Sequence, residues 1–402
     1  MADAAGELML DWLVIGGGIH GTHLAHVLVH RMRVSPDDIR ILDLHEKLLA
    51  TWSQRTKNTG MPYLRSPRVH HIDIESRSLE RFAQEHYSDE SELWIDPYFR
   101  PSYELFQQHC QHVIDTYRLD HLLISGQALT LHRTKGGWCV ETVRDRLTAR
   151  RVLLAIGRQQ LLIPDWAEKL MSDSAPIQHV LDMTFDMQQI ATGATVMVIG
   201  GGISAGQIAL KLMSNHAVIL LTRQPLRHRD FDSSPCWLGP ICLKAFRQAD
   251  YQKRRKMIGE ARQPGTLAHD IHTDLQTAIQ RKQVHHRQDT MLSAEMTADN
   301  RISLEFADGS ISTVDHVVLA TGLKAVKPEQ TWLADAMKRY QLRVADCGYP
   351  ILDRSLCWAN GLYACGSLAE LELGPAAANI AGARAAAERL YKVCQLKKRR
   401  TI

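Results

Sequence analysis

The stretch VIGGGIHG at residues 14–21 has a close copy, VIGGGISAG, at residues 198–206. In both copies a short apolar run leads into glycines, and apolar residues at helical spacing follow. A strand, a glycine turn and a helix in this order present the free N–H groups of a helix N-terminus to phosphate. The repeated phrase therefore predicts an α/β protein with two Rossmann-like dinucleotide-binding domains.

The first phrase has the G-x-G-x-x-G spacing, with Gly16, Gly18 and Gly21. The first glycine permits a tight turn, the second lets a pyrophosphate approach the backbone, and the third lets helix and strand pack closely. A second apolar run, DIRILD, ends at Asp43, about 20 residues further on, where a carboxylate binds ribose hydroxyls. Glu46 is a second candidate for that role.

The second phrase reads G-x-G-x-x-A, with Gly200, Gly202 and Ala205. The next apolar run, AVILLTR, ends in Arg223 instead of an acid. A cation at this place suits a 2′-phosphate, so the pattern favours NADPH over NADH. The alternative is a surface arginine at a strand end.

The duplication extends beyond the glycines. After each unit comes an antiparallel segment with a glycine turn, at Gly136-Gly137 in the first and at Asp308-Gly309 in the second. A buried strand that ends in A-x-G follows each of these segments. Whole domains are repeated, and each has a β-meander.

This organisation resembles that of the two-dinucleotide-binding-domain flavoproteins, which include thioredoxin-reductase-like enzymes and class B flavin monooxygenases. The resemblance implies that the first domain binds FAD, that the second binds NADPH, and that the second is inserted into the first. We expect the FAD domain at 1–165 and 312–402, and the NADPH domain at 166–311 with a helical insert within 247–288.

A C-terminal segment, GLYACGSLAELELGPAAANIAGARAAAERL at 361–390, matches the part of these flavoproteins that completes the flavin site. The resemblance assigns Gly366, Ser367 and Gly374 to FAD, and Gly374-Pro375 is expected to open an alanine-rich helix. Thioredoxin-reductase-like members usually have Gly-Asp where this chain has Gly-Ser. The likeness therefore shifts towards the amine N-hydroxylases.

The segment LLATWSQRTKNTGMPYLRSPRVHHID at 48–73 follows the predicted ribose-binding acid. In flavin monooxygenases a tryptophan and then an asparagine at this place lie against the flavin, and Trp52 and Asn58 are the matching residues. The resemblance places Asn58, Met61 and Arg65 near the reactive edge of the flavin, with Asn58 and Arg65 as catalytic candidates. The alternative is a structured loop packed around one tryptophan.

The segment between the two domains points to one branch of the family. Class B enzymes often carry F-x-G-x-x-x-H-x-x-x-W there, and only His179 matches in this chain. The ornithine and lysine N-hydroxylases have a similarly degenerate histidine, and the chain resembles them in this segment.

The resemblance implies an FAD- and NADPH-dependent monooxygenase. It would oxidise a nitrogen or sulfur of a small molecule with molecular oxygen, through a flavin C4a-hydroperoxide. One alternative is an NADPH-dependent flavin reductase or oxidase that passes electrons to a protein or quinone. Another is a non-catalytic flavin or nucleotide redox sensor.

The composition of the chain limits the classes of partner that it is expected to bind. A net charge of +4 argues against a nucleic-acid partner, and no apolar run is long enough to span a membrane. We expect a cytoplasmic protein, since the N-terminus lacks a basic region before its apolar stretch, and homo-oligomerisation stays open. The basic clusters at 253–256 and 397–400 are expected to be solvated or, alternatively, to face an anionic partner.

Cysteines and histidines give no sign of a metal or a dithiol centre. None of the eight cysteines forms C-x-x-C, so reduced and mostly buried thiols are expected. Four histidines line the first predicted helix without a carboxylate or thiol beside them, so we expect no metal site. They are His20, His23, His26 and His30.

Overall fold

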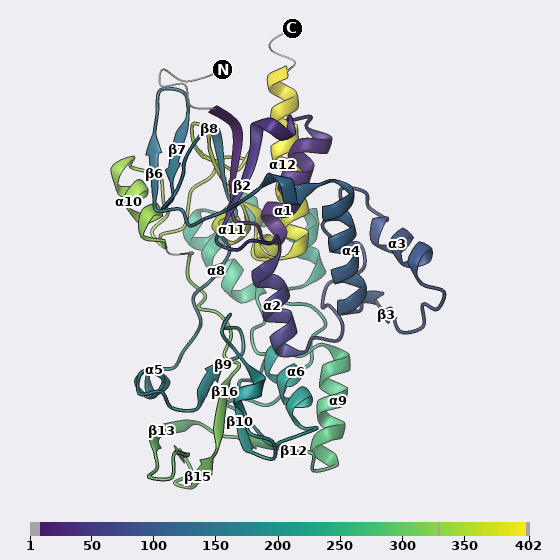
Figure 1. Ribbon diagram of the computed structural model, residues 1–402, viewed down its shortest axis with the longest axis vertical. Coiled ribbons are helices and arrows are strands. Elements are labelled where there is room, and N and C mark those ends of the chain that lie inside the picture. Colours follow the sequence, from purple (N-terminus) through teal and green to yellow (C-terminus); the bar gives the residue numbers. More distant parts are fainter. Residues whose placement is uncertain (1–8, 329, 399–402) are drawn as a thin grey trace.

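The computed structural model describes residues 9–328 and 330–398, which form two stacked lobes (Figure 1). Strand β1 (Met9–Ile15) and helix α12 (Ile380–Lys398) lie in the same lobe although they are at opposite ends of the chain. The second lobe is formed by the middle of the chain. The expected insertion of one α/β domain into another is thus confirmed.

The sheet of the first domain is built around β1, which pairs in parallel with β2 and β8. β1 is buried at five of its seven positions, including four in succession, as expected for a strand covered on both faces. The strand order is β17-β18-β8-β1-β2-β5, and the hairpin β6–β7 continues from β8 as the expected meander. The remaining strands are β2 (Ile39–Asp43), β5 (Leu123–Ser125), β6 (Thr130–Arg133), β7 (Trp138–Glu141), β8 (Arg146–Leu154), β17 (Cys357–Ala359) and β18 (Leu362–Ala364).

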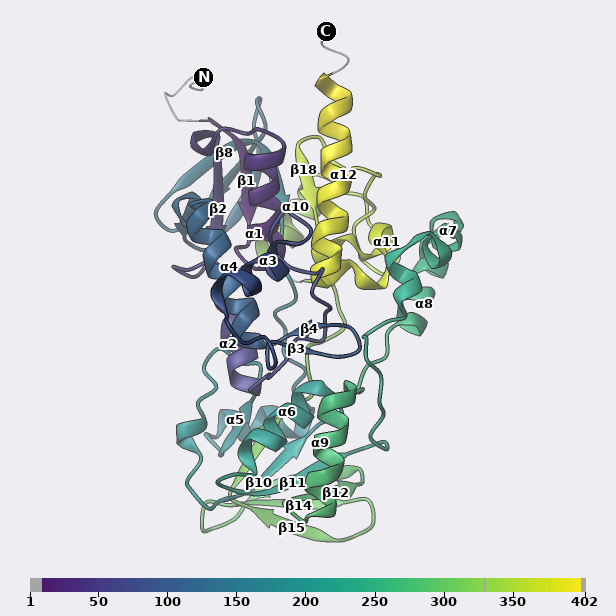
Figure 2. The ribbon, with the colours of Figure 1, turned by 90° about the vertical axis from the view of Figure 1, so that its right-hand side faces the viewer.

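Helices cover this sheet and extend towards the second domain. They are α1 (Ile19–His26), α2 (Ala50–Thr59), α3 (Ser78–His86), α4 (Tyr103–Thr116), α10 (Thr331–Arg339), α11 (Glu370–Leu373) and α12. A two-stranded ribbon, β3 (Trp94–Ile95) and β4 (Arg100–Pro101), lies near the junction between the lobes (Figure 2). The core is one apolar cluster that includes Trp12, Phe106 and Trp138.

The second domain has a five-stranded parallel sheet in the order β12-β11-β10-β16-β9. The meander and α5 pack on one face of the sheet, and α6 and α9 pack on the other. The strands are β9 (Ile177–His179), β10 (Thr195–Ile199), β11 (Ala217–Thr222), β12 (Val284–Gln288) and β16 (His316–Leu319). The meander is β13 (Met291–Met296), β14 (Ile302–Phe306) and β15 (Ile311–Val314), and the helices are α5 (Asp165–Ser172), α6 (Ile203–Leu212) and α9 (His269–Gln280).

The expected domain boundary at 312 is wrong. β15 pairs with β14, and β16 pairs in parallel with β10 from His316 to Leu319. All four residues of β16 are buried, because the strand lies inside the second sheet. The chain therefore leaves the second domain only after Leu319, and the C-terminal part of the first domain begins beyond it.

The helical insert was expected to belong to the second domain, but part of it packs on the first domain. α9 covers the second sheet, but α7 (Pro240–Gln248) and α8 (Tyr251–Ala261) lie beside α11 of the first domain (Figure 2). Phe246 and Ile258 are fully buried there, in a cluster with Tyr349 and Leu371. Apolar side chains on the two insert helices decide this placement, because they are buried only against the first domain.

In the basic cluster on α8, Lys253 and Lys256 are exposed, as expected for a solvated face, but the two arginines between them contact the first domain. The Arg254 guanidinium donates to the carbonyl oxygen of Leu371 (2.8 Å), and Arg255 donates to Glu370 (3.0 Å). These two arginines therefore fix the insert to the first domain. The C-terminal basic cluster ends outside the described residues.

A disulfide joins Cys236 and Cys242, so the expectation of reduced thiols is wrong for this pair. The turn at Pro235–Leu238 runs directly into α7 and brings the two cysteines together. Five further cysteines, at positions 110, 139, 347, 357 and 365, are thiols. Among the described helices, none has the length and apolar character needed to cross a bilayer.

Candidate functional site

In the first glycine turn, the surrounding backbone excludes a side chain at Gly16 and Gly21 but leaves space for one at Gly18. Gly16 has a φ of +110°, and a Cβ on Gly21 would lie 1.7 Å from the Gly16 carbonyl oxygen. A Cβ on Gly18 would have no heavy atom within 4 Å. The open side of Gly18, at the N-terminus of α1, is where a pyrophosphate would lie.

Asp43 lies beside this turn, as predicted. Its Oδ2 accepts a hydrogen bond from the Gly17 N–H (2.6 Å), and its Oδ1 accepts one from the His45 N–H (2.9 Å). These bonds fix the carboxylate at the carboxyl end of β2, and lone pairs remain on both oxygens. Glu46 is exposed and has no comparable contact with the turn. The geometry therefore favours Asp43 for the ribose hydroxyls.

The C-terminal segment meets the first glycine unit through His20. A Cβ on Gly366 would lie 3.7 Å from the His20 Nδ1, and the His20 Nε2 is 3.0 Å from the Asn379 carbonyl oxygen. Burial lowers the pKa of His20 to about 4, so the ring is neutral at pH 7. From the sequence, His20 could only be grouped with the other histidines of the first helix. Their spacing gives no sign that the C-terminal segment packs beside this ring.

Two buried polar atoms in this region lack a hydrogen-bond partner among the described residues. They are the Ser367 Oγ and the His20 Nδ1. Buried polar groups in native proteins nearly always have partners, so atoms of this kind mark a place for a ligand or an ordered water. With the open side of Gly18 and the Asp43 carboxylate, they fit a dinucleotide that runs along the first glycine unit.

Gly374 has a φ of +88° and starts a short turn, Pro375–Ala378, before α12 begins at Ile380. The proline therefore opens this turn, and the alanine-rich helix follows after it. A Cβ on Gly374 would lie 3.1 Å from the Leu243 Cδ2 and 3.8 Å from the Trp237 ring. The insert thus covers the residue that was expected to complete the flavin site.

The residues expected at the flavin face lie in α2 and in the loop after it. Trp52 packs against Tyr103 and Phe106, with ring centroids 5.8 and 5.1 Å apart. Met61 is half-buried against the core of the first domain. The role of Trp52 at FAD stays a prediction.

Asn58 and Arg65 both bridge the two domains. The Asn58 Nδ2 donates to the Asp182 carbonyl oxygen (2.8 Å). The Arg65 Nε donates to the Asp230 carbonyl oxygen (2.9 Å), and its Nη2 donates to the Thr266 Oγ1 (2.9 Å). These contacts give both side chains a positional role at the domain junction, and their catalytic role stays a prediction.

The second glycine turn repeats the geometry of the first. Gly200 has a φ of +152°, and a Cβ there would lie 2.4 Å from the Ala320 carbonyl oxygen. A Cβ on Gly202 would meet nothing closer than 3.6 Å. Ala205 is buried, but close helix packing depends on Gly206, whose Cβ would lie 2.7 Å from Ile271. The sequence reading missed Gly206, because α9, the helix that carries Ile271, lies far away along the chain.

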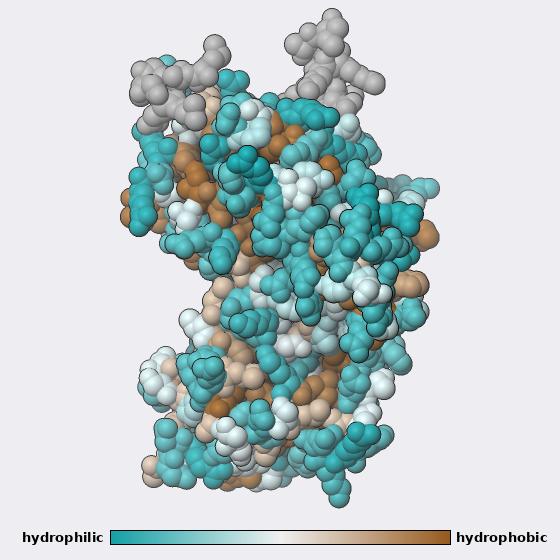
Figure 3. Space-filling model, turned by 45° about the vertical axis from the view of Figure 1, so that its right-hand side comes forward, coloured by the Kyte–Doolittle hydropathy of each residue, from teal (hydrophilic) through white to brown (hydrophobic). Residues whose placement is uncertain are grey.

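The second glycine turn opens into a cleft of about 1530 Å³. Figure 3 shows the molecule hollowed between its two lobes. Arg65, Thr321 and Gly322 line the cleft together with Gly200–Ser204. The cleft is therefore shared by the second domain and by residues from the first domain and the connecting segments.

Cations gather where β11 ends at this cleft. The exposed Arg223 has no hydrogen bond or ion pair with the described part of the chain, and Arg227 donates to the Pro264 carbonyl oxygen (2.7 Å). Arg229 and Arg262 also line the cleft. These guanidinium groups are suitable donors for a phosphate, and the role of Arg223 at a 2′-phosphate stays a prediction.

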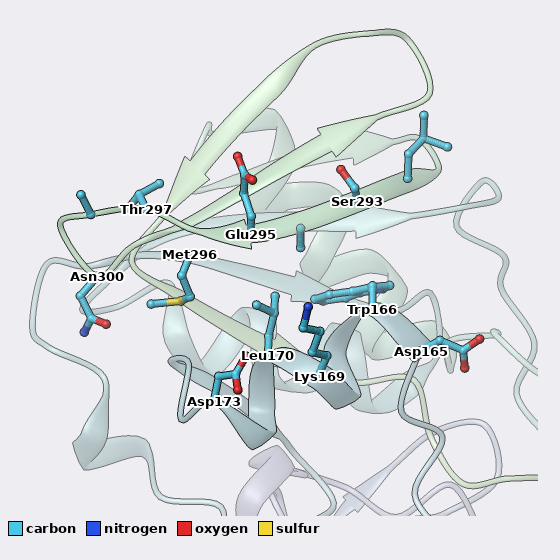
Figure 4. Close-up of a pocket in the computed structure, with 13 residues that line it drawn as sticks. Asp165, Trp166, Lys169, Leu170, Asp173, Ser293, Glu295, Met296, Thr297 and Asn300 are labelled. Carbon is cyan, nitrogen blue, oxygen red and sulfur yellow. The ribbon is translucent and has the colours of Figure 1, made fainter.

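A further hollow, of about 740 Å³, lies between α5 and β13. Trp166, Lys169 and Leu170 point from α5 towards the strand, and Met296 points from the other side (Figure 4). None of the predicted site residues lines it. Trp166 also lines the larger cleft, so the two hollows are neighbours.

Two of the histidines along α1 contact polar groups of the loop after α2. The His23 Nδ1 is 2.7 Å from the Ile72 carbonyl oxygen, and the His26 Nε2 is 3.2 Å from the Asp73 carboxylate. Burial lowers the pKa of His23 to about 3. These histidines hold the loop after α2 against α1.

Two family models match the chain. One, described as FAD-NAD(P)-binding, matches residues 13–159, and the other, described as pyridine nucleotide-disulphide oxidoreductase, matches residues 99–265. No curated protein matches the chain at a significant level.

Solved structures resemble the chain over almost its whole length. The ornithine hydroxylase PvdA from Pseudomonas aeruginosa has a TM-score of 0.76 at 16% identity, covering 96% of this chain and 99% of that one. DfoA, the FAD-bound cadaverine monooxygenase from Erwinia amylovora, has a TM-score of 0.75 at 13% identity, covering 96% and 95%. The L-lysine 6-monooxygenase from Pseudomonas syringae has a TM-score of 0.72 at 18% identity, covering 96% and 99%.

At these identities the likeness establishes the fold, and the two family models, each over less than half of the chain, are described by FAD and NAD(P) binding and by pyridine-nucleotide oxidoreduction. Both dinucleotide turns have the glycine geometry that such cofactors require. The chain therefore has two dinucleotide-binding domains, and the partial family matches and the glycine turns together indicate an oxidoreductase that uses FAD and NAD(P)H.

Proposed function

We propose that this protein is an FAD- and NADPH-dependent monooxygenase that hydroxylates a nitrogen of a small molecule. The observation that carries the proposal is the cleft shared by the two domains. The coenzyme turn at Gly200–Ser204 opens into it, and Arg65 of the first domain lines it. A coenzyme bound at this turn would extend towards the first domain, where FAD is expected.

The first domain supplies the groups that would hold FAD. Gly18 leaves room for the pyrophosphate, Asp43 would accept hydrogen bonds from the ribose, and Ser367 and His20 have unpartnered polar atoms beside the same path. Bound flavin supplies hydride acceptance and oxygen activation. The protein would hold the cofactor in place and keep His20 neutral. The insert, which covers Gly374, would limit the access of water to the flavin.

NADPH is preferred over NADH in this proposal because of Arg223. The guanidinium is exposed at the end of β11, it has no partner among the described residues, and it lines the cleft. A 2′-phosphate would form charge-assisted hydrogen bonds with it.

The assignment to nitrogen is supported by the structural neighbours. An ornithine hydroxylase, a cadaverine monooxygenase and a lysine monooxygenase have TM-scores from 0.72 to 0.76. The bacillithiol disulfide reductase from Staphylococcus aureus has a TM-score of 0.61, and the lysine monooxygenase NbtG from Nocardia farcinica has one of 0.57. We place the protein in the cytoplasm, where NADPH is available.

The experiment starts with the absorption spectrum of the purified protein after incubation with FAD. NADPH is then added without oxygen, followed by oxygen and a panel of small amines, and the products are assayed for hydroxylamines. We expect flavin bleaching by NADPH and a hydroxylamine in amounts that match NADPH consumption. Bleaching with release of peroxide alone would identify a reductase or oxidase, and flavin that NADPH does not bleach would overturn the proposal in favour of a sensor.

A further inference from the structure

The insert that follows β11 leaves the second domain and packs on the first. Its helices α7 and α8 lie beside α11 (Figure 2). The Cys236–Cys242 disulfide joins the turn at the start of the insert to the first turn of α7. The sequence reading assigned no role to either cysteine, and the flavin chemistry does not use them.

Each cysteine is followed directly by a side chain that covers Gly374. Trp237 follows Cys236, and Leu243 follows Cys242. The Leu243 Cδ2 and the Trp237 ring would lie 3.1 and 3.8 Å from a Cβ on Gly374. The disulfide thus joins the two halves of the cover over the Gly374-Pro375 turn.

The far end of the insert is held independently of the disulfide. Arg254 donates to the Leu371 carbonyl oxygen (2.8 Å), and Arg255 and Arg262 form ion pairs with the fully buried Glu370 (3.0 and 2.9 Å). Opening the disulfide would leave α7 held by apolar contacts, including those of the buried Phe246, while the arginines keep α8 attached. The loosened segment includes the exposed residues Leu238 and Ile241.

Two features of the bond favour thiol–disulfide exchange, namely its short loop and its partial exposure. It closes a short loop, with a sequence separation of 6, so it restrains the unfolded chain less than a long-range disulfide does. Both cysteines are half-buried, in contrast to the buried thiols Cys110 and Cys365. The exposed Cys347 keeps its thiol, so the chain is not a disulfide-stabilised scaffold.

We propose that Cys236 and Cys242 form a reversible dithiol–disulfide site that controls how tightly the insert covers the flavin loop at Gly374-Pro375. The inference rests on flavin binding at this loop, which belongs to the proposed function. Oxidation by hydrogen peroxide forms the S–S bond, reduces the peroxide and yields two molecules of water, with both thiol protons consumed. Reduction by a dithiol proceeds through two exchanges, in which the disulfide gains two electrons and two protons and the dithiol becomes a disulfide.

The test uses the full chain loaded with FAD, with and without dithiothreitol, and then after hydrogen peroxide. Alkylation and peptide mass spectrometry report the thiols at Cys236 and Cys242. Limited trypsin digestion reports cleavage at the exposed Lys244 and Arg247 of α7. Flavin fluorescence after dilution reports release of FAD.

We expect both cysteines to be alkylated only after reduction, and peroxide to restore their protection. Cleavage in α7 and FAD release should each rise about fivefold in the reduced protein, since local opening exposes the segment. Cys236→Ser should behave as the reduced protein under all conditions, and Cys347→Ser should behave as wild type.

Equal alkylation with and without dithiothreitol would overturn the site, and equal cleavage and FAD release in both states would overturn its control of the cover. The wild-type comparison needs no variant, so a misfolded Cys236→Ser protein does not remove the test. If FAD does not bind, the proposed function fails, and alkylation with cleavage still decides whether the dithiol site opens the insert.

Discussion

Arg100 and Asp270 form a buried ion pair across the two domains, with 2.7 Å between the Arg100 Nη2 and the Asp270 Oδ1. Arg100 lies in β4 of the first domain and Asp270 in the first turn of α9 in the second. Their side chains are 3% and 8% exposed. Together with Asn58 and Arg65, the pair shows that the domain junction is held by specific polar contacts.

Removing one member of this pair leaves a buried charge without its partner. We expect Asp270→Ala to lower the free energy of unfolding by about 3 kcal/mol. Urea denaturation followed by circular dichroism measures the change. As a control, Glu260→Ala removes the exposed Lys256–Glu260 contact and should cost less than about 1 kcal/mol. Equal losses in the two variants would show that the junction does not depend on the pair.

The first glycine turn allows a matched comparison. Gly21→Ala would place a Cβ 1.7 Å from the Gly16 carbonyl oxygen, so we expect the βα unit to be disrupted and little folded protein to be recovered. Gly18→Ala meets no atom within 4 Å, so the fold should persist while FAD binding weakens about tenfold or more. Thermal melting and FAD titration separate the two effects. Unchanged FAD affinity in Gly18→Ala would place the pyrophosphate elsewhere.

Arg223 should decide the choice of coenzyme. We expect Arg223→Ala to raise the KM for NADPH about 10- to 100-fold, because a charge-assisted hydrogen bond to the 2′-phosphate is worth about 1.5–3 kcal/mol. The KM for NADH should change little. Arg281→Ala, at the exposed end of α9, is the control and should leave both values unchanged. Steady-state oxidation of the two coenzymes supplies the measurement, and a loss shared equally by NADPH and NADH would refute the assignment.

Arg65 is expected to act by positioning the cleft. Its bonds to the Asp230 carbonyl oxygen and the Thr266 Oγ1 hold segments that line the coenzyme site. Arg65→Ala should raise the KM for NADPH about tenfold with kcat and FAD content nearly unchanged, and Arg65→Lys should restore little because an ammonium lacks the planar fork. Arg68→Ala, which removes stacking on Phe99, is the control. A fall in kcat without a change in KM would instead support a direct catalytic role.

Acid should destabilise the protein through its buried histidines. Burial lowers the pKa of each to about 3 or about 4 from the usual 6.5, so the folded state keeps them neutral while the unfolded state binds protons. Stability is therefore complete above pH 6.5 and is lost as the pH falls from 6.5 towards 4. The six are His20, His23, His71, His109, His179 and His316.

The contribution of a single histidine can be isolated at His179, which is 1% exposed. Between pH 5 and 6, His179→Gln should reduce the pH slope of the unfolding free energy by about 1 kcal/mol per pH unit, close to one proton. His121→Gln, at an exposed site, should leave the slope unchanged. Urea titrations at each pH give the slopes. A wild-type slope in His179→Gln would mean that this ring is not kept neutral in the folded state.

Several parts of the site could be predicted from the sequence because they are local. The glycine turns at Gly16–Gly21 and Gly200–Ala205, and the strand-end residues Asp43 and Arg223, each depend on a strand, a turn and a helix that are consecutive in the chain. Backbone geometry and strand length set such units almost without reference to the rest of the molecule. The repeat of the unit was enough to predict two domains.

Other parts could not be predicted because they depend on contacts between distant segments. The Cys236–Cys242 bond lacks a recognised spacing, and its relation to Gly374 arises from packing of the insert on the opposite domain. His20 faces Gly366 because the C-terminal strand β18 pairs beside β8. Neither contact can be predicted from the residues that are adjacent in the sequence.

The sequence by itself determined two nucleotide-binding α/β domains, their order along the chain and the ends of the strands at which cofactors bind. These follow from short-range periodicity and from the conformations that only glycine adopts easily. The tertiary structure alone decided where β16 and the helices α7 and α8 belong, and which side chains join the two domains. The physical reason is that burial and ion pairing depend on which surfaces meet, and that choice is made by the whole folded chain.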